Sequence, residues 1–352
     1  MNTISCVLFI LMLTSPILAQ SGNEKFKSSV KPIVQVFGAA SYNIEDEKYE
    51  YSFSRAHLGF QYQFNKDWQA RIIIDRGRAT SVEEISVTDA EGNPLTVQNT
   101  SNEGAYYTMY LKFASLRWQV TDNLSLEGGA ILQNHYITQE HFWGLRYVAQ
   151  TFQDLYWAIP SSDLGFVVRY NLNKTLLLDA AITNGEGPRV KQDTLGRVKF
   201  AGGITIYPSG NTQIRFYYHH RQAGSDSLKT EQMFSLFTGY QLERNIRIGG
   251  EFNYMNHLNN VNNTTSYGFS LYSVGQLMKR TELFIRYDQL YYDLNAANSK
   301  NEVLGNGQTF IGGISYSPAK GINLSLNYQG WLSDNESSDN KNNLFINMEY
   351  QF

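Results

Sequence analysis

The final residues of the chain, from Asn342 to Phe352, alternate between apolar and polar side chains. Successive side chains of a β-strand point to opposite faces. One face of this strand would carry Leu344, Ile346, Met348, Tyr350 and Phe352, and the other Phe345, Asn347, Glu349 and Gln351. An isolated strand of this kind leaves an unpaired edge and an exposed apolar stripe. Closing it into a barrel, with one face toward lipid and the other toward water, satisfies both faces.

The same alternation recurs along the chain and predicts an all-β, transmembrane antiparallel β-barrel of about sixteen strands. The predicted strands are Ile33–Asn43, Tyr51–Phe64, Trp68–Asp75, Ala105–Val120, Leu124–Asn134, Asp163–Leu172, Thr175–Asn184, Arg197–Tyr207, Gln213–Arg221, Glu231–Leu242, Ile246–Asn256, Thr265–Leu277, Glu282–Tyr292, Gln308–Ser317, Ile322–Leu332 and Asn342–Phe352. One position breaks the pattern: Lys112 falls on the same face as Leu116 and Trp118, which a β-bulge would correct.

The connections between the predicted strands alternate in length. Short turns, such as Pro318–Gly321, alternate with longer polar loops, such as Asp293–Gly307. Membrane barrels have this arrangement, with short periplasmic turns and longer external loops. A β-sandwich also has regularly spaced strands, but it less often separates them by two alternating classes of connection. A long insertion, Gly77–Gly104, contains a predicted hairpin around Ala90–Asn93.

The third long connection, His135–Ser162, has the spacing of a helix. Apolar residues recur three or four positions apart at Phe142, Leu145, Val148, Phe152 and Leu155, and Pro160 ends the pattern. If this insertion folds into the barrel, it constricts the passage. The candidate residues at that constriction are Glu140, His141, Arg146, Gln150 and Asp154. An external lid and a helix packed on a neighbouring subunit are the alternatives.

The N-terminus is typical of an export signal. Residues from Ile4 to Leu18 are nearly all apolar and end in a small-residue site at Ala19. We expect residues 1–19 to be a cleaved signal peptide, 20–32 a lead-in and 33–352 the barrel. A membrane-anchor helix is the alternative, but the apolar run is short and contains Pro16. Cys6 is the single cysteine, so the mature chain would lack thiol chemistry.

Composition narrows the possible partners. The formal net charge is −3 and the chain has no long basic run, so a nucleic-acid partner is not predicted. There are 24 Tyr and 20 Phe against 7 Pro, a balance that favours strands and aromatic girdles at membrane interfaces. The expected partners are outer-membrane lipid and small hydrophilic or anionic solutes.

The face opposite the apolar stripe should line the lumen, which in a barrel of sixteen strands is wide enough for water. Its basic residues are Arg55, His57, Arg71, Arg117, Arg169, Lys199, Arg215, His219, Arg221, Arg247 and Arg286. Its acidic residues are Asp75, Glu127, Asp179, Glu251, Glu282 and Asp288. A bore lined in this way should favour anions. The alternative is that the charges neutralise one another in pairs, such as Arg247 with Glu251.

The sequence contains no pattern that predicts catalysis, a cofactor or a metal site. A GxSxG elbow, a Walker loop and a HExxH helix are all absent from the sequence. Tyr217–His220 places two histidines next to each other, but neighbouring residues of a strand face opposite sides and cannot share an ion. We therefore expect no enzymatic activity.

Several short motifs resemble those of bacterial outer-membrane porins of the phosphate-selective porin O/P type. They are Phe142-Trp143-Gly144, Arg146-Tyr147-Val148, Thr151-Phe152-Gln153-Asp154, Ser161-Ser162-Asp163-Leu164-Gly165 and Thr183-Asn184-Gly185-Glu186-Gly187. The terminal Phe352 also resembles the C-terminal signature of outer-membrane barrels. The resemblance implies a passive channel, a barrel of sixteen strands and a homotrimer. The candidate constriction lacks a lysine cluster, in contrast to the expectation for a phosphate channel.

Together these features predict an outer-membrane porin, a passive diffusion channel for small hydrophilic solutes with an anion preference. Two other functions fit the same features. A non-conducting structural or adhesive barrel would use its external loops to bind a partner. A secreted β-sandwich that binds or cleaves glycans would need no membrane.

Overall fold

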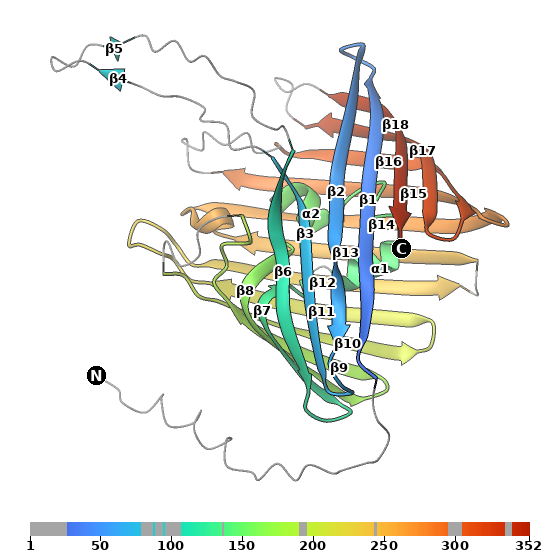
Figure 1. Ribbon diagram of the computed structural model, residues 1–352. Coiled ribbons are helices and arrows are strands. Elements are labelled where there is room, and N and C mark those ends of the chain that lie inside the picture. The colour runs from blue at the N-terminus through green and yellow to red at the C-terminus, as the bar shows by residue number, and fades with distance from the viewer. Residues whose placement is uncertain are drawn as a thin grey trace, which may run out of the picture.

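The computed structural model describes residues 27–78, 87–88, 94–95, 107–135, 137–189, 196–242, 245–294, 305–334 and 340–352. Sixteen strands form a closed antiparallel barrel, in which β1 (Ser29–Asn43) pairs with β18 (Lys341–Gln351) to complete the ring. Figure 1 shows this ring of strands. The predicted fold class and strand number are confirmed. The predicted signal peptide, residues 1–19, lies outside the described residues.

Each barrel strand pairs with its neighbours in chain order, apart from a jump from β3 to β6. The remaining barrel strands are β2 (Lys48–Gln63), β3 (Trp68–Arg78), β6 (Tyr107–Gln119), β7 (Leu124–Leu132), β8 (Ser162–Asn173), β9 (Leu176–Thr183), β10 (Lys199–Ser209), β11 (Thr212–Arg221), β12 (Glu231–Leu242), β13 (Ile246–Asn256), β14 (Thr264–Met278), β15 (Thr281–Leu294), β16 (Gly307–Ala319) and β17 (Ile322–Ser333). The two short strands between β3 and β6, β4 (Val87–Thr88) and β5 (Pro94–Leu95), form the predicted hairpin as a separate sheet.

The two faces of the strands differ as predicted. On β18, Ile346 is 61% exposed on the outer face, whereas Asn347 on the inner face is 4% exposed. Large apolar side chains are also exposed on the outer face of the other barrel strands except β7, for example Leu58 on β2 and Leu326 on β17. Exposed apolar groups over a whole outer wall match a lipid environment, because such a surface aggregates in water.

Aromatic pairs lie at both ends of the outer wall. Trp68 stacks on Trp118 with ring centroids 5.3 Å apart, at the end where β2 turns into β3. Tyr267 stacks on Tyr291 with centroids 4.9 Å apart, at the opposite end. Two aromatic levels that flank an apolar band are the girdles of a membrane barrel.

The connections divide into a short-turn end and a long-loop end of the barrel. Two-residue turns at 174–175, 210–211, 279–280 and 320–321 lie at the short-turn end. The connections at 133–161, 184–198, 222–230, 295–306 and 334–340 lie at the long-loop end, as predicted. One connection at that end is shorter than the others, because β1 and β2 are joined by residues 44–47 alone. The first strand begins at Ser29, inside the predicted lead-in.

A β-bulge explains the irregular position of Lys112. In the pairing of β3 with β6, Ile73 lies opposite Phe113 and Ile74 lies opposite Leu111, so Lys112 is the extra residue. The bulge places both Lys112 and Phe113 on the inner side, where both are buried. At the bulge, the alternation of inward-facing and outward-facing side chains along β6 shifts by one residue.

The insertion between β7 and β8 contains two short helices, α1 (Ile137–Trp143) and α2 (Phe152–Trp157). The helical spacing predicted through Phe142–Leu155 is divided between these two helices. Gly144 adopts φ +71°, the left-handed conformation that ends a helix, and a turn follows before α2. No helix of the described chain is long and apolar enough to cross a bilayer. In Figure 1, α1 and α2 lie within the ring of strands.

The outer face of β18 provides a test of the lipid-facing wall. We expect Ile346→Arg to lower the free energy of unfolding in lipid vesicles by about 2–4 kcal/mol, because it places a charge in the apolar band. Ile346→Val keeps the surface apolar and should remain close to the unaltered protein. Urea unfolding followed by tryptophan fluorescence measures both. If Ile346→Arg had the same free energy of unfolding as the unaltered protein, this face would not contact lipid.

Candidate functional site

The insertion docks on one side of the barrel interior. Trp143 of α1 is completely buried, with its ring centroid 4.9 Å from that of Tyr272 and 6.1 Å from that of Phe284. Its indole Nε1 donates a hydrogen bond to the carbonyl oxygen of Ala149, 3.1 Å away. Together with Phe237, these residues form an apolar cluster between the insertion and strands β12–β15. The burial of several aromatic side chains holds α1 against the wall.

The second helix docks beside the first, on the same side of the barrel. Phe152, Tyr156 and Trp157 pack with the inward-facing Met233 and Met255. The polar atoms of these aromatic residues also have partners, since Trp157 Nε1 donates to Ser266 Oγ at 2.8 Å and Tyr156 Oη donates to Asp288 at 2.8 Å. Buried aromatic groups with satisfied polar atoms fix both the position and the orientation of the helix.

Hydrogen bonds fix the turn between the helices. Tyr147 Oη lies 2.7 Å from Ser315 Oγ on β16, and Gln329 on β17 donates to the carbonyl oxygen of Val148 at 3.0 Å. Burial raises the pKa of Tyr147 to about 12, so its hydroxyl stays protonated at neutral pH. The insertion is therefore fixed to the inner wall from β12 to β17.

Two of the predicted motifs meet at the stem of the insertion. The carboxylate of Asp163 accepts hydrogen bonds from the backbone N–H groups of Gly185 and Gly187, at 2.5 and 3.2 Å. Gly185 has φ +79°, and a Cβ atom there would lie 2.8 Å from the side chain of Arg221. Gln133 closes the stem by donating to the carbonyl oxygen of Pro160. These motif residues hold the ends of the insertion together.

The docked insertion covers part of the predicted pore lining. Lys199 and Arg215 are 3% and 2% exposed, and Asp179 and Glu251 are also buried. Arg215 donates to both carboxylate oxygens of Asp179, at 2.7 and 3.1 Å. The backbone N–H of Phe152 lies 3.3 Å from Glu251. These four residues face inward, where they are neutralised or covered.

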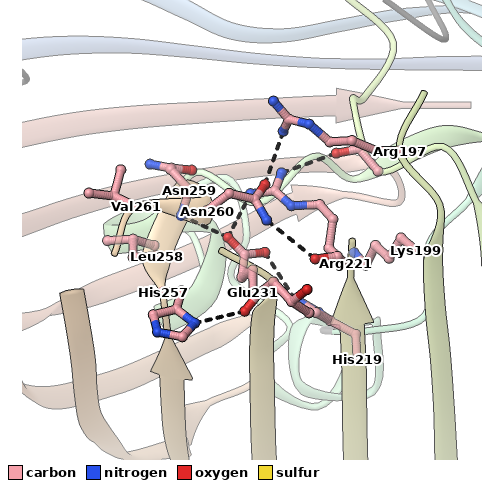
Figure 2. Close-up of polar contacts among 12 residues, drawn as sticks. Arg197, Lys199, His219, Arg221, Glu231, His257, Leu258, Asn259, Asn260 and Val261 are labelled. Carbon is pink, nitrogen blue, oxygen red and sulfur yellow. Dashed lines mark hydrogen bonds and ion pairs between the residues drawn. The ribbon is translucent and has the colours of Figure 1, made fainter. Parts of the chain in front are cut away.

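Arg221 belongs to a polar network at the long-loop end, shown in Figure 2. Glu231 accepts from Arg221 at 2.6 Å and from the backbone N–H of Asn259 at 2.8 Å, and His219 Nε2 lies 3.1 Å from it. Asn260 donates to the carbonyl oxygen of Lys229 at 2.7 Å. This network fixes the loop after β13, and the cavity beside it, about 40 Å³, holds no more than a few water molecules.

Arg247 has a different partner from the predicted one. Its guanidinium donates to Glu282 at 2.9 and 3.3 Å, across the strand between them, and not to Glu251. Its Nε also donates to the carbonyl oxygen of Trp143. Residues 247 and 251 both face inward on β13, but Glu251 lies under α2 and is out of reach. The predicted Arg247–Glu251 pair is wrong, although Arg247 is indeed neutralised.

The opposite wall, formed by β2, β3, β6, β7 and β8, is not covered in the same way. Arg71, Arg117 and Arg169 come from three of these strands and surround Glu127 on β7. Arg169 Nη1 lies 2.8 Å and Arg71 Nη2 3.4 Å from the Glu127 carboxylate. Arg117 forms no ion pair within the described chain and donates instead to Gln119. We call these four residues the arginine cluster. They line a cavity of about 210 Å³.

A chain of ion pairs joins this wall to the insertion. Arg55 on β2 lies 3.7 Å from Glu140 on α1, and Glu140 also pairs with Arg146 at 3.2 Å. Arg146 donates to Asp154 at 2.7 Å. The structure thus brings together three of the five candidate constriction residues. His141 is exposed beside them, whereas Gln150 uses its carbonyl oxygen to accept from Arg286 on the covered side.

Lys112, Phe37 and Phe113 support the open wall and were not among the predicted lining residues. Lys112 donates to Asp75 at 2.7 Å, and His57 Nε2 lies 3.3 Å from the same carboxylate. Phe37 and Phe113 are buried beneath the guanidinium groups of Arg55 and Arg71, at 4.6 and 4.7 Å from ring centroid to Cζ. In the sequence, Lys112 stood out because it falls on the same face of its predicted strand as Leu116 and Trp118. An inward-facing phenylalanine under an arginine gives no comparable signal.

Comparison with solved structures shows what this arrangement is similar to. The outer membrane channel DcaP of Acinetobacter baumannii is 15% identical over 94% of this chain and 99% of its own, with a TM-score of 0.60. OmpF of Salmonella typhi, in complex with daunomycin, is 13% identical over 94% and 99%, with a TM-score of 0.67. The anion-selective porin from Comamonas acidovorans is 10% identical over 93% and 100%, with a TM-score of 0.66.

The fold is that of outer-membrane porins. No protein-family model matches the chain, and comparison with curated proteins finds no match. At this level of identity the resemblance establishes the porin architecture, and any function must be argued from the side chains in the barrel.

Docking of the insertion can be tested through Trp143. We expect Trp143→Ala to lower the free energy of unfolding by about 3–5 kcal/mol, because it leaves a cavity between α1 and the wall. His141→Ala, on the exposed side of the same helix, should change stability by less than about 0.5 kcal/mol. Denaturant unfolding in detergent micelles measures both. If the two substitutions lowered the free energy of unfolding equally, the packing of Trp143 would not be what holds α1.

Proposed function

We propose that this chain is an outer-membrane porin that lets small hydrophilic solutes diffuse passively, with a preference for anions. The proposal rests on the arginine cluster. Two of its arginines share one carboxylate, and the third has none among the described residues. The cluster therefore keeps an excess of positive charge on the wall that the insertion leaves uncovered.

The charges on the two walls explain why an excess remains. On the covered side, Arg215 pairs with Asp179, Arg247 with Glu282 and Arg286 with Asp288. On the open wall of the described chain, the inward-facing basic side chains outnumber the carboxylates. The basic residues are Arg55, Arg71, Lys112, Arg117 and Arg169, and the acidic residues are Asp75, Glu127 and Asp163. A narrow wet passage between low-dielectric walls concentrates ions of the opposite sign.

The remaining parts of the proposal concern export and assembly. Residues 1–19 would direct export and be removed, the short-turn end would face the periplasm, and the mature chain would assemble as a homotrimer in the outer membrane. A closer relation to the phosphate-selective porin O/P type is supported by the motifs of residues 141–165 and 183–187, which meet at the stem of the insertion.

A second candidate function is a non-conducting structural or adhesive barrel, with the insertion as a plug. The contact of Arg55 with Glu140 favours it, because that ion pair connects the insertion to the opposite wall. Planar-bilayer recording separates the two functions. A porin gives stepwise conductance, whereas a plugged barrel is silent.

We expect the reversal potential in a KCl gradient to indicate anion selectivity. Arg117→Gln and Arg169→Gln should each shift it toward zero, because each removes positive charge from the open wall. Raising the salt from about 0.1 M to about 1 M should weaken the preference, because the screening length falls from roughly 10 to 3 Å.

Lys174→Gln is the matched control, since it removes one positive charge in the exposed turn between β8 and β9. It should leave selectivity near that of the unaltered protein. A cation-selective channel, or a control that shifts the potential as much as the two arginine variants, would contradict the assignment of the arginine cluster.

Glu140→Gln should increase the anion preference. The substitution removes a carboxylate that contacts both Arg55 and Arg146, so their positive charge becomes available to solutes. Glu282→Gln removes one carboxylate from the covered side, where Arg247 is its partner. The reversal potential should therefore move further for Glu140→Gln than for Glu282→Gln. The opposite order would mean that the solute path runs past Glu282.

A further inference from the structure

The cavity at the arginine cluster has a chemistry beyond positive charge. Its lining comes from five adjacent strands, because register places Gln61 opposite Arg71, Gln69 opposite Arg117, and Arg117 opposite Glu127. Hydrogen-bonding side chains make up this lining apart from Leu132. An apolar or aromatic solute would leave these amides and guanidiniums without partners, whereas a hydroxylated solute would satisfy them.

Arg117 is the group on which a solute carboxylate can bind. Its guanidinium donates one hydrogen bond, to Gln119, and forms no ion pair within the described chain. Arg71 and Arg169 are engaged with Glu127. A guanidinium presents a planar fork of donors that matches a carboxylate, and hydrogen bonds of this charge-assisted kind are stronger than neutral ones.

Glu127 disfavours a second negative group. It already accepts from Ser115 at 2.7 Å and from two arginines, and it lies in the centre of the cluster. Its charge repels a dianion placed across the cavity, whereas a hydroxyl can donate to it. Gln61 has no hydrogen-bond partner among the described residues, and Gln69 keeps its amide oxygen after donating to Gln63. Both amides are therefore available to hydroxyl groups.

We propose that this cavity is a binding subsite for a polyhydroxylated monocarboxylate of the size of a hexuronic acid. The carboxylate binds Arg117, and the hydroxyls bind Gln61, Gln69 and Glu127. A cavity of about 210 Å³ on the open wall accommodates one such ring. The inference rests on the proposed function, since it names a solute class for the same passage.

The test uses the full-length protein in a planar bilayer and measures how strongly added solutes reduce the KCl current. Glucuronate should halve the current at a concentration at least about tenfold lower than glucose, acetate or succinate, because only glucuronate uses both the guanidinium and the amides. Arg117→Gln should raise this concentration about tenfold, and Gln61→Met about fivefold.

Gln213→Met, on β11 and outside the cavity lining, is the matched control and should leave block by glucuronate unchanged. Gln61→Met alters no charge, so the anion selectivity of this variant should equal that of the unaltered protein. Block by succinate or acetate as strong as that by glucuronate, or an equal loss in the Gln213→Met variant, would overturn the subsite. An anion-selective channel without glucuronate block would leave the proposed porin function intact, whereas a silent channel would overturn both.

Discussion

The structure depends on the docking of one insertion against one half of the barrel interior. A barrel of sixteen strands is too wide for its own side chains to fill, so inward-facing apolar residues such as Phe237, Phe284 and Met255 would otherwise meet water. The aromatic residues of α1 and α2 cover them. Burial of this surface holds the insertion in place, and the Asp163 contacts to Gly185 and Gly187 fix its stem.

Docking makes the interior asymmetric. The covered half has an aromatic interior whose charges are paired, as in Arg286 with Asp288. In the uncovered half, the guanidinium groups of Arg55 and Arg71 lie over the rings of Phe37 and Phe113. Arg117 forms no ion pair within the described chain. The Arg55–Glu140 contact marks where the two halves approach each other. The place where the insertion packs therefore determines which inward-facing charges are covered.

The fold was predictable because the period of two is a local signal that repeats through the chain. Parity alone placed Ile346 outside and Asn347 inside. Parity also placed Arg215 and Arg117 on the same inner face, but it cannot tell which is covered, since that depends on a segment distant in sequence. The division of the helical pattern into two helices was not predictable for a related reason, because the apolar spacing of Phe142–Leu155 reflects contacts with the wall on both sides of the turn at Gly144. The sequence indicated that Lys112 was irregular, and pairing with β3 showed why.

Thiol accessibility tests the division of the interior most directly, because Cys6 is the single cysteine and lies in the predicted signal peptide. Gln61→Cys places a thiol on the open wall, and Ser235→Cys places one under Gln139 and Gln153 of the insertion. A charged, membrane-impermeant thiol reagent applied to open channels should modify position 61 rapidly and reduce the current, and should leave position 235 unmodified. Equal modification of both positions, or modification of position 235 alone, would contradict the account.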